Sequence, residues 1–224
     1  MTRVDEIKKL LDICTAEERA ESLRYLQSRL PAHPIEELFC AKAELILEAI
    51  HLSGELTRPM LKGVIAEAAF NIEVASKLDG FQVTPTVGNP SFDVLLEDAR
   101  GSVRVQVKLQ RSKEQQPWVR ERAGRRSYVV ETQKTRGGVK KGEQTRPYRF
   151  GEFDILAVSL FPATRHWDRF RYTIAGWLLP DPNHRKNIGK YQPVAMDVNA
   201  DWTDDFLEAV EWFRSAKRKR IAPF

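Results

Sequence analysis

Two adjacent stretches of sequence constrain the fold of this chain more than any other feature. In residues 103–108 three valines alternate with polar or charged residues, and a period of two is typical of a strand with one buried face. Residues 92–96 have the character of a second strand, and residues 98–101 between them favour a turn. The sequence therefore predicts a β-hairpin.

The hairpin brings an acid, an amide and an amine to one face. If Glu97 faces Ser102 across the turn, counting back two residues at a time places Asp93 opposite Gln106, with Lys108 one step beyond. Directly opposed Cβ atoms in a hairpin lie roughly 5 Å apart. A carboxylate, an amide oxygen and an amine at such spacing predict a seat for a divalent metal and a phosphate.

Composition limits the class of protein. The 224 residues are 42% hydrophobic and 30% charged, which indicates a globular domain with a full core, with or without a helical appendage. No apolar run approaches the ~18 residues of a membrane span, and the first residues lack the apolar core of a signal peptide. Cys14 and Cys40 lie in helical patterns, so we expect buried, reduced thiols and a cytoplasmic protein.

The positive charge of the chain is concentrated in one block. Residues 111–149 hold twelve Lys and Arg against four Asp and Glu, a balance of +8, although the whole chain carries only +5 and the rest is therefore −3. Trp118, Tyr128 and Tyr148 are interleaved with these charges. Such a mixture favours loops that follow a phosphate backbone, and hence a polyanion as partner. A second basic run, residues 217–220, fits a solvated face as well as a polyanion contact.

The order of predicted elements indicates an α/β or α+β fold with an N-terminal helical part. We expect residues 1–56 to form a helical subdomain for dimerisation or DNA wrapping, and residues 57–224 to form the core. The late helix should turn Phe206, Leu207, Val210 and Phe213 inward. Helices are predicted over residues 4–11, 15–29, 35–52, 57–80 and 203–217, and strands over residues 81–83, 92–96, 103–108, 128–132, 153–160 and 170–179.

A family resemblance rests on residues 60–110. Glu67 lies in a helix ahead of the hairpin, Asp93 ends Pro90-Ser91-Phe92-Asp93, and Lys108 ends Gln106-Val107-Lys108. This order resembles the PD-(D/E)XK nuclease superfamily, whose core is a helix carrying Glu followed by a hairpin carrying Asp and (Glu/Asp)-x-Lys. Two residues are inserted in the Pro-Asp pair, and Gln replaces the second acid. The size, the basic loops and the lone domain look most like a type II restriction endonuclease.

The resemblance implies a mixed central β-sheet flanked by helices, and a Mg²⁺ ion held by Asp93, the Gln106 carbonyl and Glu67. Lys108 would orient the attacking water or stabilise charge on the phosphate, and the products would carry 5′-phosphate and 3′-hydroxyl ends. An amide oxygen is an acceptable ligand for a hard cation, but Gln removes one negative charge from the site. Glu73 and Glu55 are alternatives to Glu67.

Asp154 is a further acid, placed between apolar strand residues. It fits a role beside the metal, but we favour a structural role in which the carboxylate binds a neighbouring loop amide.

The predicted partners are double-stranded DNA, a second copy of the chain, and a cognate DNA methyltransferase of the same system. Arg binds guanine bidentately and Gln binds adenine in the same way, although many arginines contact phosphates only. Two-fold protein symmetry would match palindromic sites. The candidate DNA contacts in the basic loops are Arg120, Arg122, Arg125, Arg126, Gln133, Lys134, Arg136, Lys140, Lys141 and Arg146.

Three other interpretations stay open. A structure-specific repair nuclease would use the same core. A DNA-binding module that has lost catalysis is compatible with Gln106. Finally, ordinary alternation on a surface hairpin also exposes an Asp, a Gln and a Lys.

Overall fold

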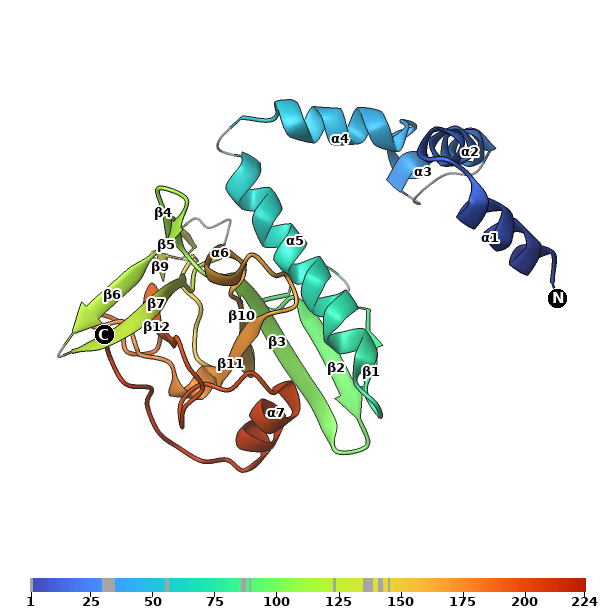
Figure 1. The fold of residues 1–224 in the computed structure, drawn as a ribbon. Helices are drawn as coiled ribbons and strands as arrows, with labels where there is room; N and C mark the ends of the chain where they lie inside the picture. Colours follow the sequence, from blue (N-terminus) through green and yellow to red (C-terminus); the bar gives the residue numbers. More distant parts are fainter. Residues whose placement is uncertain are drawn as a thin grey trace. The chain divides into compact units, whose positions relative to one another are not determined.

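The structure is a computed structural model. In it the chain forms two compact units, Met1–Arg58 and Pro59–Phe224 (Figure 1). The boundary expected from the sequence lay between residues 56 and 57. The structure describes residues 2–29, 35–54, 57–85, 88, 90–122, 124–134, 139–140, 143–144 and 146–224, and for residues 27–29, 139–140 and 143–144 it describes the backbone alone.

Four helices make up the first unit. They are α1 (Arg3–Ile13), α2 (Ala16–Arg29), α3 (Ile35–Phe39) and α4 (Ala43–Leu52). The capping box predicted at Thr15 is present, since the Thr15 backbone N–H donates to Glu18 Oε2 at 2.8 Å and the Glu18 N–H donates to Thr15 Oγ1 at 3.3 Å. No described side chain of α1, α3 or α4 is buried.

The prediction of a single helix over residues 35–52 is wrong. The helix is interrupted between α3 and α4, where Cys40 adopts a left-handed conformation with φ of +48°. Glu36 stabilises the break, because its Oε1 accepts a hydrogen bond of 2.6 Å from the first backbone N–H of α4, at Ala43. Cys14 and Cys40 were expected to be buried, but Cys14 is half-buried and Cys40 is exposed.

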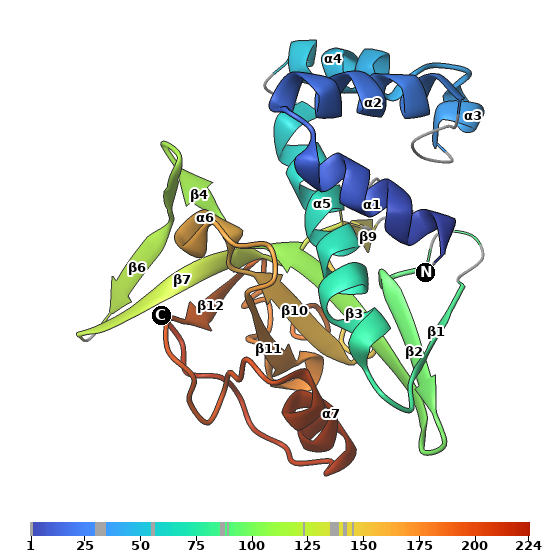
Figure 2. The ribbon, with the colours of Figure 1, turned by 45° about the vertical axis from the view of Figure 1, so that its right-hand side comes forward.

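A five-stranded mixed sheet forms the centre of the second unit, in the order β1-β2-β3-β10-β11 (Figures 1 and 2). The predicted hairpin register is confirmed, with Glu97 opposite Ser102 and Val94 opposite Val105. Strand β10 runs parallel to β3, and the other pairs are antiparallel. The strands are β1 (Gln82–Thr84), β2 (Val94–Asp98), β3 (Gly101–Leu109), β10 (Ile155–Ser159) and β11 (Phe170–Ile174).

Helices α5 (Thr57–Glu73) and α7 (Phe206–Arg214) both pack on the same face of this sheet. The Phe70 ring of α5 lies 5.7 Å from Phe170, 6.4 Å from Tyr172 and 5.5 Å from Phe206 of α7, between ring centroids and edge to face. Val107 pairs with Ala157, and Ala157 pairs with Tyr172, so the Val107 side chain lies on the same face of the sheet as Tyr172. Neighbouring residues of a strand point to opposite faces, so Gln106 and Lys108 lie on the other face.

A second sheet, in the order β12-β7-β6, begins where β3 ends. The Arg111 N–H donates to the Val129 carbonyl at 2.8 Å, which links the two sheets. The strands of this second sheet are β6 (Val119–Arg122), β7 (Arg125–Glu131) and β12 (Tyr191–Ala195). The shorter elements are β4 (Ser112–Lys113), β5 (Gln116–Pro117), β8 (Val139–Lys140), β9 (Glu143–Gln144), α6 (Phe161–Thr164), and the 3₁₀ turns η1 (Ala75–Lys77) and η2 (Ala175–Trp177).

The structure confirms a mixed α+β fold with a central mixed sheet flanked by helices. As predicted for a central strand, all of β10 is buried. The predicted ends differ: α5 stops at Glu73, and α7 begins after Asp205, whose carboxylate caps the helix by accepting from the N–H groups of Leu207 and Glu208. Leu207 is 48% exposed, and Ala209 is buried instead. Among the residues described, no helix is both long enough and apolar enough to span a membrane.

Candidate active site

Asp93 lies directly before β2 and continues the hairpin pairing by one residue. Its backbone N–H donates to the Val105 carbonyl at 2.9 Å. Its carboxylate Oδ2 accepts hydrogen bonds from the Val107 N–H, at 2.8 Å, and from the side-chain amide of Gln106. The register therefore brings Asp93 and Gln106 together, and these two hydrogen bonds fix the carboxylate beside β3.

Lys108 is held on β3 two residues beyond Gln106. Burial lowers the pKa of its amine, and the charges of Asp93, Glu67 and Glu131 act in the opposite direction. Its Nζ lies 5.3 Å from the centroid of the Tyr148 ring. The amine is thus half-buried between an aromatic face and carboxylates.

Glu67 joins this group from α5. It follows Ala66, which is fully buried, so the helix holds the Glu67 side chain half-buried at the edge of its packed face. Burial, and then the nearby Asp93 charge, raise the Glu67 pKa to about 7, and Lys108 opposes both. Burial likewise raises the pKa of Asp93, against the lowering by Lys108 and by the hydrogen bonds of Val107 and Gln106. The ionisation of these two carboxylates is therefore linked to that of one amine.

Gln106 is 1% exposed and completes the group. Its amide nitrogen donates to Asp93 and, at 3.3 Å, to the Val107 carbonyl. Its carbonyl oxygen, Oε1, is buried and accepts no hydrogen bond within the described part of the chain. A buried acceptor without a donor is unfavourable by roughly 1–3 kcal/mol, so this oxygen is suited to a further partner. Rotation of the amide group would exchange the oxygen and nitrogen positions.

The donor atoms of this group fit a hard divalent cation. Glu67 and Asp93 offer carboxylate oxygens and Gln106 an amide oxygen, and Mg²⁺ is commonly bound by one or two carboxylates with waters and substrate phosphate. A cation would also stabilise the charged forms of two carboxylates whose pKa values are raised. Within the described residues, no cluster of three or more His, Cys, Asp or Glu side chains forms a richer metal site.

No protein-family model matches the chain, and no curated protein matches it. One similar solved structure is that of a bacterial homing endonuclease, I-Ssp6803I, with 21% sequence identity over 70% of this chain and 91% of that chain. Its TM-score is 0.39, which is too low for the likeness to support an inference.

The alternative acids have other contacts. Asp154 is bound by Arg104, whose Nη2 donates to Oδ1 at 2.7 Å and whose Nε and backbone N–H donate to Oδ2 at 3.0 and 2.9 Å. This pair ties β3 to the start of β10. Asp154 therefore makes structural contacts, but with the strand residue Arg104 and not with the loop amide that we expected. Glu73 pairs with Lys77 at 2.6 Å, one helical turn further along. Glu55 lies outside the described residues.

Sequence reasoning missed the acids that surround Lys108 and Tyr148. Lys134 Nζ lies 5.2 Å from the Tyr148 ring and 2.8 Å from Glu152 Oε1. Burial, and then the charges of Asp93 and Glu152, raise the pKa of the Tyr148 hydroxyl, so it stays protonated. Glu131 acts on Lys108 from β7. These contacts depend on the bridge between Gln133 and Pro147, for which the sequence carries no local signal.

The candidate DNA contacts fall into four groups. Arg122, Arg125 and Arg126 are exposed at the turn between β6 and β7, and Arg146 is exposed near Glu131. Arg120 instead lies over the rings of Trp118, Tyr191 and Phe224, at 4.7, 5.4 and 4.7 Å. Gln133 and Lys134 are half-buried, and Lys134 is next to the proposed site. Arg136, Lys141 and the side chain of Lys140 lie outside the described residues.

Proposed function

We propose that the chain is a Mg²⁺-dependent, sequence-specific endonuclease of double-stranded DNA, of the type II restriction class. The observation that carries this proposal is the hairpin geometry that binds the half-buried Asp93 carboxylate to Gln106 and to the Val107 N–H, next to the half-buried Lys108. The shifted pKa values of Asp93, Glu67 and Lys108 support it. Buried acids and bases with mutually shifted pKa values are typical of catalytic sites. Their order in the chain, helix acid, then hairpin acid, then hairpin lysine, is the order expected from the resemblance.

The residues have distinct roles in this proposal. Asp93 and Glu67, with the Gln106 carbonyl, would hold Mg²⁺, which when bound polarises a scissile phosphate and lowers the pKa of a water ligand. Lys108 donates hydrogen bonds to the attacking water or to a phosphate oxygen. Because burial brings the Lys108 pKa closer to neutrality, its amine exchanges a proton more readily than an exposed lysine does. The products carry 5′-phosphate and 3′-hydroxyl ends.

Gln106 modifies the site rather than abolishing it. In this structure its amide nitrogen holds the Asp93 carboxylate; rotation of the amide would replace that hydrogen bond and turn Oε1, which has no partner among the described residues, toward a cation at Asp93. One fewer negative charge weakens cation binding, so the scissile phosphate supplies part of the negative charge around the metal.

Recognition of DNA falls to the basic loops 111–149. The exposed Arg122, Arg125 and Arg126 would contact backbone phosphates. Arg146, whose Nη2 lies 3.9 Å from Glu131 Oε1, would contact DNA as well. A homodimer would present two sites to a palindrome, and a methyltransferase of matching specificity would protect the host DNA in the cytoplasm.

Plasmid digestion with Mg²⁺, with EDTA as the control, tests the proposal. Discrete bands that disappear in EDTA support a restriction enzyme. Nicking, or cutting confined to branched DNA, would instead indicate a structure-specific repair nuclease. Tight, salt-sensitive binding without cleavage would indicate a DNA-binding module of the same fold.

A further inference from the structure

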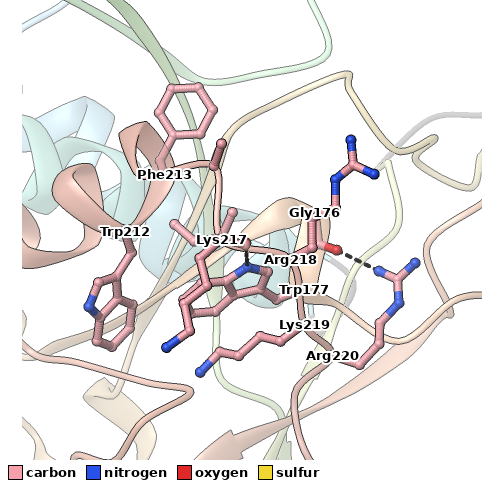
Figure 3. A pocket seen from close by; sticks show the side chains of 10 residues that line it. Gly176, Trp177, Trp212, Phe213, Lys217, Arg218, Lys219 and Arg220 are labelled. Atoms are coloured by element: carbon pink, nitrogen blue, oxygen red, sulfur yellow. Dashed lines mark hydrogen bonds between the residues drawn. The ribbon is translucent and has the colours of Figure 1, made fainter.

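A pocket of about 700 Å³ lies between η2, the end of α7 and the segment that follows α7 (Figure 3). Trp177 and Trp212 form its aromatic wall, and Phe213 also lines the pocket, with its ring pointing away from the two tryptophans (Figure 3). Four consecutive cations, residues 217–220, line it together with Ile174, Gly176 and Ala216, and no acidic residue is among the lining residues. The composition of this pocket therefore suits a ligand that is both flat and anionic.

Trp177 anchors the aromatic wall, and Trp212 packs against it with part of its ring exposed. Trp177 is 2% exposed, and its indole N–H donates to the Lys217 carbonyl at 2.7 Å, so its polar edge is already bound. Trp212 is half-buried, and its ring centroid lies 5.3 Å from that of Trp177 at an interplanar angle of 31°. A ring held in this way offers a stacking surface at little cost in side-chain entropy.

The backbone that carries the four cations is fixed to the core. Ala216 turns the chain after α7 with a left-handed φ of +53°, and the Ile221 N–H donates to the Trp177 carbonyl at 2.9 Å. Ile221 itself is 1% exposed. A solvated tail would not need these contacts, so the fold itself holds the cations at the pocket.

Two of the four cations are occupied and two are not. Lys219 pairs with Asp201 at 2.9 Å and lies 4.1 Å from the Trp177 ring, and Arg220 donates to the Leu178 carbonyl at 3.0 Å. Lys217 and Arg218 are exposed, and their side chains form no ion pair or hydrogen bond with the described residues. These two side chains are therefore available to an anion beside the aromatic wall.

We propose that this pocket binds one nucleotide of a single-stranded DNA segment, with the base stacked on Trp212 and the phosphate on Lys217 and Arg218. Aromatic faces accept every base, and lysine and arginine neutralise the phosphate, which is the chemistry of sequence-tolerant strand binding. The site is separate from the carboxylates around Asp93 and does not depend on catalysis there. It gives the chain a second nucleic-acid contact outside the basic loops 111–149.

Fluorescence anisotropy of a labelled oligothymidine in EDTA tests this site without any cleavage. Lys217→Ala/Arg218→Ala should weaken binding tenfold or more and reduce the log–log salt slope by about 0.7 for each phosphate that the variant no longer neutralises. The matched control is Arg185→Ala/Lys186→Ala, which removes two adjacent exposed cations outside the pocket. Equal weakening in both double variants would overturn the proposal, because general electrostatics would then explain the binding.

A second comparison isolates the base. Trp212→Leu should weaken binding of oligothymidine about tenfold but leave a fully abasic strand of the same length unaffected, and Trp212→Phe should retain most of the affinity. Equal weakening on both strands would exclude base stacking in the pocket. Both assays are run in EDTA and measure binding alone, so a protein without nuclease activity still gives a clear result for the pocket.

Discussion

The Asp93 carboxylate accepts a hydrogen bond of 2.8 Å from the backbone N–H of Val107, the residue between Gln106 and Lys108. A single peptide group thereby fixes the acid of one strand against the amide and the amine of the next. The adjacent Gln106 side chain donates to the same carboxylate oxygen, which leaves its own Oε1 without a partner among the residues described.

Gln106→Glu should bring a second buried carboxylate against Asp93. In EDTA we expect the free energy of unfolding to fall by roughly 1–3 kcal/mol, because two like charges then share a buried position. Mg²⁺ should recover this stability, and cleavage should reach its half-maximal rate at a lower Mg²⁺ concentration than in the wild type. Thermal unfolding and a Mg²⁺ titration of cleavage measure the two effects. An unchanged Mg²⁺ dependence would mean that position 106 does not face the cation.

Glu67→Gln should remove a pH-dependent cost of folding. The Glu67 pKa is about 7 in the folded protein against 4.5 for the free side chain, so the folded state binds its proton more tightly. The stability that this provides is present below pH 4.5 and is lost as the pH rises through 7. In EDTA, the melting temperature of Glu67→Gln relative to that of the wild type should therefore increase as the pH is raised from 4.5 to above 7. Parallel curves for the two proteins would contradict the burial of Glu67 beside Asp93.

Lys108→Met should separate catalysis from folding. We expect cleavage to fall about 100-fold or more, since general acid–base and charge-stabilising groups typically contribute 10²–10⁴-fold. The Glu67 pKa should rise above 7, because Lys108 lowers it in the wild type. A pH titration of the ¹³C-labelled glutamate carboxyl groups measures this shift, with Lys113→Met as a control that removes an exposed lysine of β4. A Glu67 pKa that does not change would show that the two groups are far apart.

Asp154→Asn should affect stability and leave the chemistry intact. Arg104 donates three hydrogen bonds to this carboxylate. Removal of the Asp154 charge should therefore lower the free energy of unfolding by about 1–3 kcal/mol. The cleavage rate per folded molecule, measured well below the melting temperature, should stay within a few-fold of the wild type. A decrease comparable to that of Lys108→Met would instead assign Asp154 to the metal site.

The core of the fold was predictable where the sequence carries its own periodicity. The turn expected at residues 98–101, together with the alternation of residues 103–108, predicted the hairpin register, and the apolar run over residues 153–160 predicted the buried strand β10. Strand β12 was missed, because Pro193 within Tyr191–Ala195 argues against a paired strand from sequence alone. The break at Cys40 was missed as well, since it depends on the Glu36 side chain capping the next helix.

The candidate site was predictable only where its residues are close in sequence. Asp93, Gln106 and Lys108 belong to one hairpin, so their proximity could be predicted from the local pairing. The influence of Tyr148 and Glu131 on Lys108 arises from segments that meet only in three dimensions. The sequence also did not indicate that the Gln106 nitrogen, rather than its oxygen, would face Asp93, because the hydrogen bond to a carboxylate decides the amide orientation.

Single-turnover cleavage of one DNA duplex by the wild type and by Asp93→Asn, with Mg²⁺ and with EDTA, tests the nuclease proposal most directly. The Val107 N–H and the Gln106 amide nitrogen donate to the same Asp93 oxygen, so the side-chain oxygen of asparagine can accept both hydrogen bonds, and the fold should be retained while the negative charge is removed. We predict Mg²⁺-dependent cleavage at a fixed position by the wild type, and a decrease of about 100-fold or more in Asp93→Asn at an unchanged melting temperature. Full cleavage by a folded Asp93→Asn, or cleavage by the wild type in EDTA, would contradict the assignment of Asp93 to a metal-dependent active site.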